Sequence, residues 1–531
     1  MREALRFFVY LVAATVVTWP LATDPTAWVV GAPRSDTWNS LWGLWFVEAH
    51  GPMPTWTSLL DHPRGGRIAV ADPLNGLLAI PLVRAWGPVA AYAMLVLGHL
   101  GLAGWAADLL GRACGGRGWV AGFGYQLAPI ALAHLNNGAS EAVATGWLPL
   151  SCWATLQVLH RGGSGRALAA GALLFVCALG SWYAGIVAWV FAGAAVTLGT
   201  HPRPTVRWSR AAPAAILALG LTLPVASSVR AVAQSDEGLV AIKADEDLHR
   251  IRRTLGSADP RSFFMPGEFR SPNFPELEGN PSDYLHTTYP GWFLFGLALW
   301  CSRRRTSEAS GLAPPDRVWW TTAGACAVLS LGPVLVWDGV PVDFLGRALP
   351  LPYLALEALP GFSALSLLYR LAIGTTLALC IVADRAAPGL AAVVALEALL
   401  LSPALGGPAV TRIPDLGGLT GLEEGAVLNL PITASRTYLF EQTVHGQPLV
   451  GSLNTGTNLA GLKVASMARK VRSDEASMNE LKELAREQKI RWIVVHRNQL
   501  MSDREVAVLG ALRRDGELAS EDAHVRVYRL Y

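Results

Sequence analysis

Long apolar stretches separated by short polar connections run through residues 1–405 of the chain. A helix needs about 20 apolar residues to cross the hydrocarbon core of a bilayer, and many of these stretches approach that length. The pattern therefore predicts an α-helical polytopic membrane protein with about eleven spans. The predicted spans cover residues 5–21, 88–110, 118–134, 141–159, 167–183, 184–200, 211–229, 289–302, 318–337, 363–383 and 387–405.

The pattern changes after residue 405, where shorter apolar runs alternate with polar segments that contain most of the lysines of the chain. We expect strands over residues 427–430, 491–495 and 525–528 and a helix over 474–488. The sequence Ser502-Asp503-Arg504-Glu505 is a capping box that predicts a further helix, ending at Gly516. The chain is thus divided into a transmembrane domain, 1–405, and a small α/β domain, 406–531.

Composition and charge placement support this topology. Hydrophobic residues make up 52% of the 531 positions and charged residues only 16%, as expected of a membrane protein. Arginine-bearing connections follow every second span, which identifies the cytoplasmic side. The N-terminus is predicted to be cytoplasmic, and loops 23–86, 231–288 and 338–362 and the α/β domain lie outside. The arginines that fix this orientation are Arg112, Arg117, Arg161, Arg166, Arg203, Arg207, Arg210, Arg303, Arg304, Arg305 and Arg385.

One short apolar segment does not fit a span. Residues 74–86 are too few to cross a bilayer comfortably, and Arg84 lies among them. We interpret the segment as a re-entrant or interfacial helix on the outer side. It ends before Pro88, which begins the second full span.

The first outer loop holds an acid directly before an aromatic helix. Asp36 precedes a run in which Trp38, Leu41, Trp42, Trp45 and Phe46 recur at helical spacing and share one face. Tryptophan favours the membrane–water interface, so we predict a helix lying on the membrane surface. Asp36 then either meets a lipid headgroup or only caps the helix N-terminus.

Other polar residues lie in or beside the spans, where polar groups are expensive to place. Arg370 falls about two turns into a span and suits a phosphate, or alternatively snorkels to the outer interface. The remaining candidates have ordinary explanations as helix caps, turn residues or solvated loop residues. These candidate ligand-binding residues are Asp72, His134, Asn136, Glu141 and Asp283.

Several functional classes find no support in the sequence. The six cysteines form no C-x-x-C pair, and the histidines lack metal-ligand spacing. Phosphate-binding loops, dinucleotide fingerprints and the G-x-S-x-G motif are also missing from the sequence. We therefore predict no metal site, no cofactor and no nucleic-acid partner.

A series of short motifs, in a fixed order, resembles the GT-C superfamily of integral-membrane glycosyltransferases, in a bacterial branch related to protein O-mannosyltransferases and aminoarabinose transferases. The likeness extends over most of the chain, and the order of the motifs carries it. The motifs that follow Asp36 along the chain are His62-Pro63-x-Gly65, Asp72-Pro73-Leu74-Asn75, His134-Leu135-Asn136, Gly146-Trp147-Leu148-Pro149-Leu150, Tyr289-Pro290-Gly291, Leu331-Gly332-Pro333, Leu359-Pro360-Gly361-Phe362 and Tyr369-Arg370.

This resemblance implies a function and roles for two residues. A polyprenyl-phosphate sugar would be the donor, transferred with inversion on the periplasmic face of a bacterial inner membrane to an acceptor glycan, lipid or protein. Asp36 matches the catalytic base and Arg370 the phosphate-binding arginine. The chain departs from the family pattern in lacking a second acid beside Asp36 and in keeping only Tyr369-Arg370 of an Arg-x-Pro-x-Arg motif.

Two other classes of function remain open from the residues alone. Eleven spans with embedded charges also suit a transporter or lipid flippase, although the chain has no pair of similar halves. A non-catalytic membrane assembly protein that binds partners through its C-terminal domain is the third interpretation.

Overall fold

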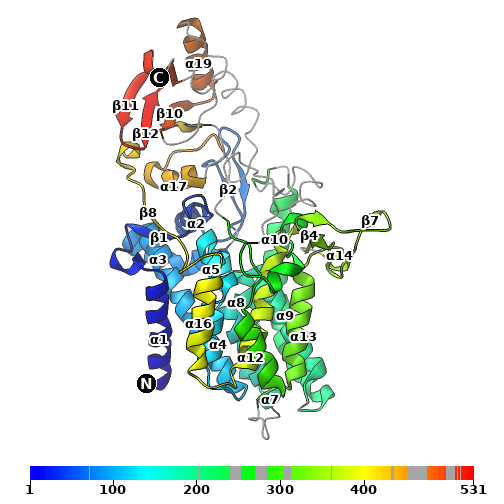
Figure 1. Ribbon diagram of the computed structural model, residues 1–531. Coiled ribbons are helices and arrows are strands. Elements are labelled where there is room, and N and C mark those ends of the chain that lie inside the picture. The colour runs from blue at the N-terminus through cyan, green and yellow to red at the C-terminus, as the bar shows by residue number, and fades with distance from the viewer. Residues whose placement is uncertain are drawn as a thin grey trace.

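The computed structural model consists of a helix bundle with a smaller helix-and-sheet region stacked on one end (Figure 1). We call the bundle end that carries this region the domain end, and the opposite end, where the N-terminus lies, the far end. The described residues are 1–70, 72–200, 202–235, 237–239, 253–268, 284–303, 312–359, 362–431, 436–451, 475–497, 509–510, 512–514 and 516–531.

Every stretch that the hydropathy pattern assigned to a span contains a helix, although several of these helices are shorter than predicted. Among the described residues, α3 and α10 are long and apolar enough to cross a membrane by length and composition. The others are shorter, so the predicted number of spans stays a prediction. The helices are α1 (Arg2–Val17), α3 (Pro73–Ala113), α4 (Trp119–Gln126), α5 (Pro129–Asn137), α6 (Ser140–Val143), α7 (Trp147–Arg161), α8 (Ser164–Gly180), α9 (Trp182–Leu198), α10 (Pro204–Gln234), α12 (Trp292–Arg303), α13 (Asp316–Ser330), α15 (Ile373–Ala383) and α16 (Leu390–Leu401).

Breaks in these helices follow proline and glycine. At Gly87 the backbone of α3 leaves the helical region with φ +79°, so the outer segment and the following span are two helices, as the sequence predicted. The predicted span 118–134 is divided into α4 and α5 just before Pro129, because proline offers no N–H to continue a helix. After these breaks, α5 and α6 lie at the domain end.

The centre of the bundle is α15, whose residues are all buried. A 3-10 turn, η5 (Leu368–Ala372), leads into it from the domain end. Arg370 belongs to this turn. The prediction that it lies two helical turns inside a span is therefore wrong, because residues 365–367 just before the turn are not helical.

Three of the arginines predicted to share one side lie at the far end. Arg112 donates to the Glu3 carboxylate at 2.9 and 2.8 Å near the N-terminus, and the Arg117 amide donates to the Asp384 carbonyl at 3.3 Å. Arg385 forms an ion pair with Asp316 at the start of α13. The position of these arginines agrees with the charge pattern from which the orientation of the chain was predicted.

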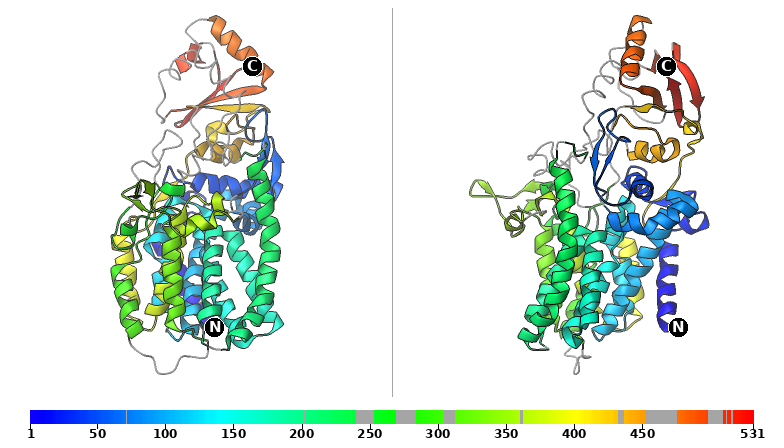
Figure 2. Two further views of the ribbon diagram at one scale, coloured as in Figure 1. Left: turned by 90° about the vertical axis from the view of Figure 1, so that its right-hand side faces the viewer. Right: turned by 180° about the vertical axis from the view of Figure 1, so that it is seen from behind.

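The first outer loop packs between the bundle and the C-terminal region (Figure 2). Its helix α2 (Thr37–His50) contacts both α3 and α17 (Arg436–His445). Two of its short strands form a hairpin and a third pairs antiparallel with β8, which leaves the bundle toward the C-terminus. These strands are β1 (Trp28–Val30), β2 (Thr55–Thr57), β3 (Gly66–Ile68) and β8 (Val410–Arg412).

The aromatic face of α2 is covered by protein. Trp38 and Trp42 are 3% and 1% exposed. The centres of the Trp38 and Phe440 rings lie 5.3 Å apart, and Trp42 Nε1 donates to Gln442 Oε1 at 2.7 Å. The prediction that this face lies on the membrane is therefore wrong. A pattern of aromatic residues shows which face is buried but not what covers it.

The C-terminal region is built on a four-stranded sheet in the order β11-β12-β10-β9, with β9 and β10 parallel and the other pairs antiparallel. Strands β9, β10 and β12 and helix α19 confirm the sequence prediction. Strand β11 was missed because its mostly exposed, polar residues carry no apolar alternation. The capping box at 502–505 lies outside the described residues. The elements are β9 (Ala426–Leu430), η6 (Gly417–Leu419), α19 (Glu475–Glu487), β10 (Ile490–His496), β11 (Glu517–Glu521) and β12 (Val525–Arg529).

The two faces of this sheet pack differently. Leu428 and Ile493 face a core with Leu481 and Ala485 of α19. Alternate residues join a larger core that continues through α17 into α2 and α3. The sheet is thus packed onto the first outer loop through α17, and its hydrophobic core is continuous with that of the loop.

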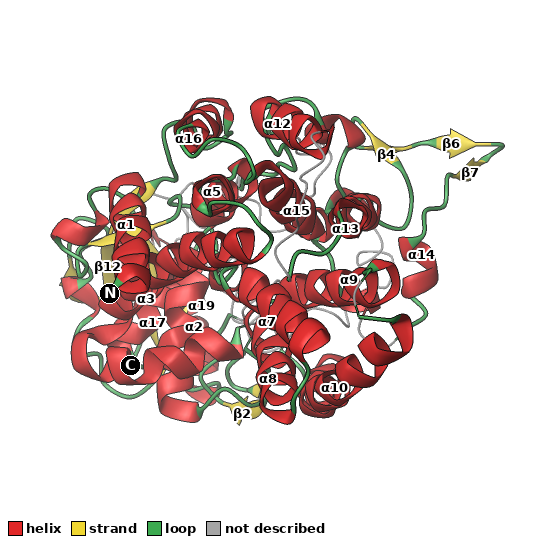
Figure 3. Ribbon diagram, turned by 90° about the horizontal axis from the view of Figure 1, so that it is seen from below, coloured by secondary structure: helices red, strands yellow, loops and turns green. Residues whose placement is uncertain are grey.

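Within loop 338–362 and just before it, two small hairpins and short helical turns extend sideways from the bundle at the domain end (Figure 3). The sequence predicted only a loop here. The elements are β4 (Val336–Trp337), β5 (Val340–Pro341), β6 (Asp343–Phe344), β7 (Arg347–Ala348), α14 (Tyr353–Leu356) and η4 (Phe362–Ala364).

Candidate active site at the domain end

The start of α2 is held tightly against the end of α5. The Asp36 amide donates to the Asn137 carbonyl at 2.9 Å, and Ser40 Oγ donates to the Gly138 carbonyl at 2.9 Å. Gly138 has φ +67°, and a Cβ there would lie 1.9 Å from Thr37 Oγ1. Only glycine fits this position, because it combines a left-handed backbone with a close approach of another segment. Asp36 is therefore fixed by backbone contacts.

The Asp36 side chain does not cap its own helix. It occupies the N-cap position of α2, yet its carboxylate accepts no capping hydrogen bond from the helix. Its Oδ1 instead pairs with Arg436 Nε at 2.7 Å and accepts from Asn39 Nδ2 at 3.2 Å. About a quarter of each side chain of the ion pair is exposed. The carboxylate thus faces the space between α2 and the C-terminal region.

Arg436 is the first residue of α17, and it brings a cation from the C-terminal region to Asp36. Its guanidinium lies 5.2 Å from the centre of the Tyr284 ring. The pKa of Tyr284 is well above its usual range because the hydroxyl is buried and because Asp36 is close; Arg436 and Arg370 act in the opposite direction. Tyr284 therefore lies within electrostatic reach of one acid and two arginines.

Arg370 and Glu141 come together from positions far apart in the chain. Arg370 Nη1 pairs with Glu141 Oε1 at 2.7 Å, and the Arg370 side chain is 4% exposed. Its guanidinium lies 5.6 Å from the centre of the Tyr183 ring. Arg370 Nε makes no hydrogen bond of good geometry within the described part of the chain. Part of this donor set is therefore available to a ligand.

Beside Arg370 lies a cluster of aromatic rings. The centre of the Tyr369 ring lies 4.6 Å from the centre of the His286 ring and 5.8 Å from the centre of the His134 ring. His134 and Tyr369 are each 2% exposed. Neither the ring nitrogens of His134 nor the Tyr369 hydroxyl has a well-oriented hydrogen-bond partner among the described residues. Buried polar groups normally find partners, so this cluster is suited to a polar ligand.

The other predicted residues lie close by but are used by the fold. Asp72 caps α3 by accepting the Asn75 amide at 3.1 Å, and burial raises its pKa to about 7. Asn136 Oδ1 accepts the Ala409 amide at 3.1 Å, which ties α5 to the chain entering the C-terminal region. Asp283 lies outside the described residues.

Sequence reasoning missed Arg436 and Tyr284. Arg436 carries no local signal, since an arginine at the start of a soluble helix is ordinary. Tyr284 gave only the weak signal of lying next to Asp283. No group of three histidine, cysteine, aspartate or glutamate residues in the described ranges is placed to hold a metal ion.

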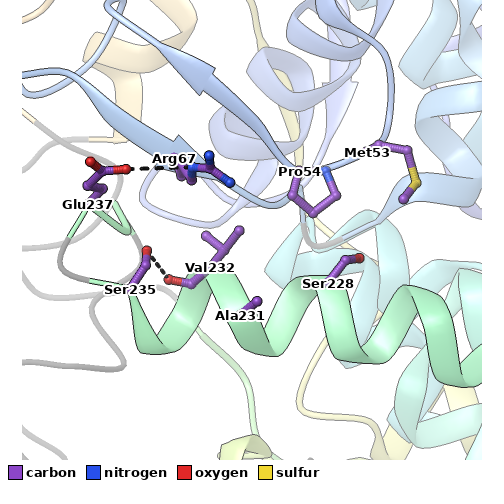
Figure 4. Close-up of a pocket in the computed structure, with 8 residues that line it drawn as sticks. All are labelled: Met53, Pro54, Arg67, Ser228, Ala231, Val232, Ser235 and Glu237. Atoms are coloured by element: carbon purple, nitrogen blue, oxygen red, sulfur yellow. Dashed lines mark hydrogen bonds and ion pairs between the residues drawn. The ribbon is translucent and has the colours of Figure 1, made fainter.

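A separate hollow of about 340 Å³ lies between the β2–β3 hairpin and the end of α10 (Figure 4). Its Arg67 is paired with Glu237 at 3.6 Å, and both side chains are more than half exposed. The hollow includes none of the residues that surround Asp36, so it lies apart from the candidate site. It is lined by Met53, Pro54, Arg67, Ser228, Ala231, Val232, Ser235 and Glu237.

No protein-family model and no curated protein matches this sequence, but solved structures do. Arabinofuranosyltransferase AftD from Mycobacteria superposes with a TM-score of 0.53 at 16% identity, over 100% of this chain and 40% of that chain. The apo oligosaccharyltransferase of Archaeoglobus fulgidus superposes with a TM-score of 0.52 at 11% identity, over 93% of this chain and 69% of that chain. The fold is that of the GT-C glycosyltransferases. The resemblance stated from the sequence is thereby confirmed for the fold.

At these identities the likeness concerns the fold alone. ArnT from Cupriavidus metallidurans also aligns, over 99% of this chain and 98% of that chain, with a TM-score of 0.44 and 14% identity. This chain spans well under half of AftD, so any function must be argued from its own residues.

Proposed function

We propose that this protein is a membrane glycosyltransferase that moves a sugar from a polyprenyl-phosphate donor to an acceptor hydroxyl. The observation that carries the proposal is the Asp36 carboxylate. It sits at a helix N-terminus without capping it and faces a site that also contains two arginines. A carboxylate fixed in this way suits a general base.

In the proposed reaction, the acceptor oxygen attacks the anomeric carbon from the face opposite the phosphate. Asp36 takes the proton of the attacking hydroxyl. The bond between the anomeric carbon and the phosphate oxygen breaks, and its electron pair leaves with the polyprenyl phosphate. Displacement from the opposite face inverts the anomeric configuration.

Arg370 is proposed to bind the leaving phosphate. A guanidinium is always charged and offers several donors in one plane, which matches phosphate oxygens. Glu141 holds one of its nitrogens, and Nε points to no well-oriented partner in the described chain. His134 and Tyr369 would supply further hydrogen bonds to the donor. These groups stabilise the negative charge that develops as the bond breaks.

We further propose that the domain end faces the periplasm of a bacterial inner membrane, with the N-terminus in the cytoplasm. The arginine-rich far end supports this orientation. An archaeal neighbour, AglB, was solved with an inhibitory peptide and a dolichol-phosphate, which agrees with a lipid-linked donor. The acceptor, whether a glycan, a lipid or a protein, is left open by the proposal.

The test compares wild type with Asp36→Asn, both purified in detergent and incubated with radiolabelled polyprenyl-phosphate sugars and a membrane extract as acceptor source. We expect transfer to fall by a factor of about 10² to 10⁴ in the variant. Glu48→Gln is the matched control, because Glu48 lies on the same helix and pairs with Arg84 at 2.9 Å. It should transfer at the wild-type rate.

Equal transfer by wild type and Asp36→Asn would remove Asp36 from the role of base. Lipid binding without transfer across a broad panel of donors would contradict the transferase proposal and favour a flippase or an assembly protein.

A further inference from the structure

The C-terminal region supplies a charged residue to the candidate active site. Asp36 occupies the N-cap of α2, and Arg436 is the first residue of α17, so two helix N-termini meet there. Helix N-termini carry partial positive charge and favour anions. Asp36 is one such anion, and its Oδ1 pairs with Arg436 Nε at 2.7 Å.

The charges of the site are balanced before any donor enters. Arg436 pairs with Asp36 and Arg370 with Glu141. A phosphate brings additional negative charge, which the site must neutralise. Arg370 Nε, His134 and Tyr369 offer buried donors without well-oriented partners in the described structure, so a phosphate placed there would be hydrogen-bonded but not fully neutralised.

The ion pair with Arg436 also limits Asp36 as a base. The guanidinium engages Asp36 Oδ1 at 2.7 Å, so an acceptor hydroxyl must compete with Arg436 for that oxygen. Proton abstraction is therefore easier once the arginine has moved to another anion.

The C-terminal region itself is firmly placed, so only the arginine side chain needs to move. Phe440 packs on Trp38, and Gln442 accepts a hydrogen bond from Trp42 at 2.7 Å. The Arg436 guanidinium lies 5.2 Å from the centre of the Tyr284 ring. About a quarter of its surface is exposed. A partly exposed arginine side chain of this kind changes rotamer without movement of the backbone.

We propose that Arg436 is shared between Asp36 and the phosphate of the lipid donor, so that phosphate binding draws the arginine away and frees the Asp36 carboxylate. The identity of the donor rests on the proposed function. The coupling of base and phosphate through a residue of the C-terminal region goes beyond it. Asp36 Oδ1 would then be free to accept a proton from the acceptor hydroxyl only when a donor is in place.

The test measures binding of polyprenyl phosphate, without any sugar, to the full-length protein in nanodiscs, with the uncharged polyprenol as reference. We expect wild type to prefer the phosphate and Arg436→Gln to lose affinity by at least about tenfold. Asp36→Asn should bind the phosphate more tightly, by about fivefold, because the competing carboxylate charge is gone. In the double variant the gain from Asp36→Asn should vanish.

Two controls separate a local effect from misfolding. Arg436→Lys keeps the charge and should bind with intermediate affinity, and Glu48→Gln should bind as wild type does. Because Asp36→Asn is expected to raise affinity, a damaged protein cannot imitate that result.

The proposal is overturned if Arg436→Gln binds as wild type does, if wild type fails to distinguish the phosphate from polyprenol, or if Asp36→Asn leaves the affinity unchanged or lowers it. A gain with Asp36→Asn that persists in the double variant also contradicts it. Because no sugar is transferred in this experiment, the transferase proposal can fail while the coupling stands.

Discussion

At the far end of the bundle the buried Asp108 carboxylate accepts several hydrogen bonds, whereas at the domain end His134, Tyr369 and Arg370 keep buried polar atoms without well-oriented partners among the described residues. Asp108 is fully buried and accepts from Tyr10 at 2.9 Å and from Arg112 at 2.6 Å, and it also pairs with Arg6. Asp384, nearby, accepts the amides of Gly118 and Ala121 at the start of α4.

The domain end also has buried polar and charged residues, but their hydrogen bonding differs. The donors of His134, Tyr369 and Arg370 Nε have no well-oriented partners within the described ranges. Polar groups that are fully hydrogen-bonded stabilise a fold, while a buried donor without a partner lowers stability unless a ligand supplies the acceptor. In this comparison the Asp108 carboxylate has its hydrogen bonds made, whereas the cluster of His134, Tyr369 and Arg370 keeps polar atoms that a ligand could engage.

The largest expected effect is the loss of the far-end network. Asp108→Asn removes the charge that Arg6 and Arg112 share, and we expect the free energy of unfolding to fall by about 3 kcal/mol. Both arginines are about a quarter exposed and can turn toward water, which keeps the loss from being larger. Chemical unfolding in detergent measures it.

Glu48→Gln provides the control for that experiment. Its partner Arg84 is 66% exposed, so the change in stability should stay within about 1 kcal/mol. Equal losses for the two variants would show that burial of the far-end network contributes little.

Asp72 tests whether the hydrogen bonds of a polar residue or its location determine its role. It lies at the domain end, but its carboxylate caps a helix. Its pKa of about 7 in the folded protein is above the ordinary 3.8. Stability from this group is therefore fully present below about pH 4 and is lost as the pH rises through 7.

We expect wild type to lose about 2 kcal/mol of stability between pH 5 and 8 through Asp72. Asp72→Asn, which keeps the oxygen that caps α3, should flatten this part of the profile without abolishing phosphate binding. An unchanged pH profile in the variant would show that Asp72 is not the titrating group, and a loss of phosphate binding would place Asp72 in the ligand site.

The smallest effect comes from two matched tyrosines. Tyr10→Phe removes a hydroxyl that donates to Asp108, and we expect a loss of about 1.5 kcal/mol. Tyr369→Phe removes a hydroxyl without a well-oriented partner in the described structure, so its stability should be equal to wild type or slightly higher.

The affinity for polyprenyl phosphate should show the reverse order. Tyr369→Phe should lower this affinity several-fold, and Tyr10→Phe should leave it unchanged. Thermal unfolding and the nanodisc binding assay measure the two properties on the same samples. If Tyr369→Phe is destabilised as much as Tyr10→Phe, the contrast between the two ends fails.

The sequence by itself determined the class of fold and most of its elements. Hydropathy located the helices, and the glycine and proline near position 87 placed the break in α3. Alternating apolar residues marked β9, β10 and β12. These features depend on local periodicity, which a single sequence displays directly. Strand β11 escaped because an exposed edge strand needs no apolar face.

The sequence also selected the candidate residues but could not separate their roles. Asp36 and Asp72 both precede a helix and both read as N-caps. Only the tertiary structure showed that Asp72 caps its helix and that the Asp36 side chain turns to Arg436 instead.

The tertiary structure also decided what covers α2. Its aromatic face predicted a membrane surface, but the C-terminal region lies there, brought by β8 and α17 from far along the chain. Arg436 reaches Asp36 across 400 positions of sequence, and Arg370 reaches Glu141 across 229. Such pairings depend on the packing of whole elements, which local sequence patterns do not encode.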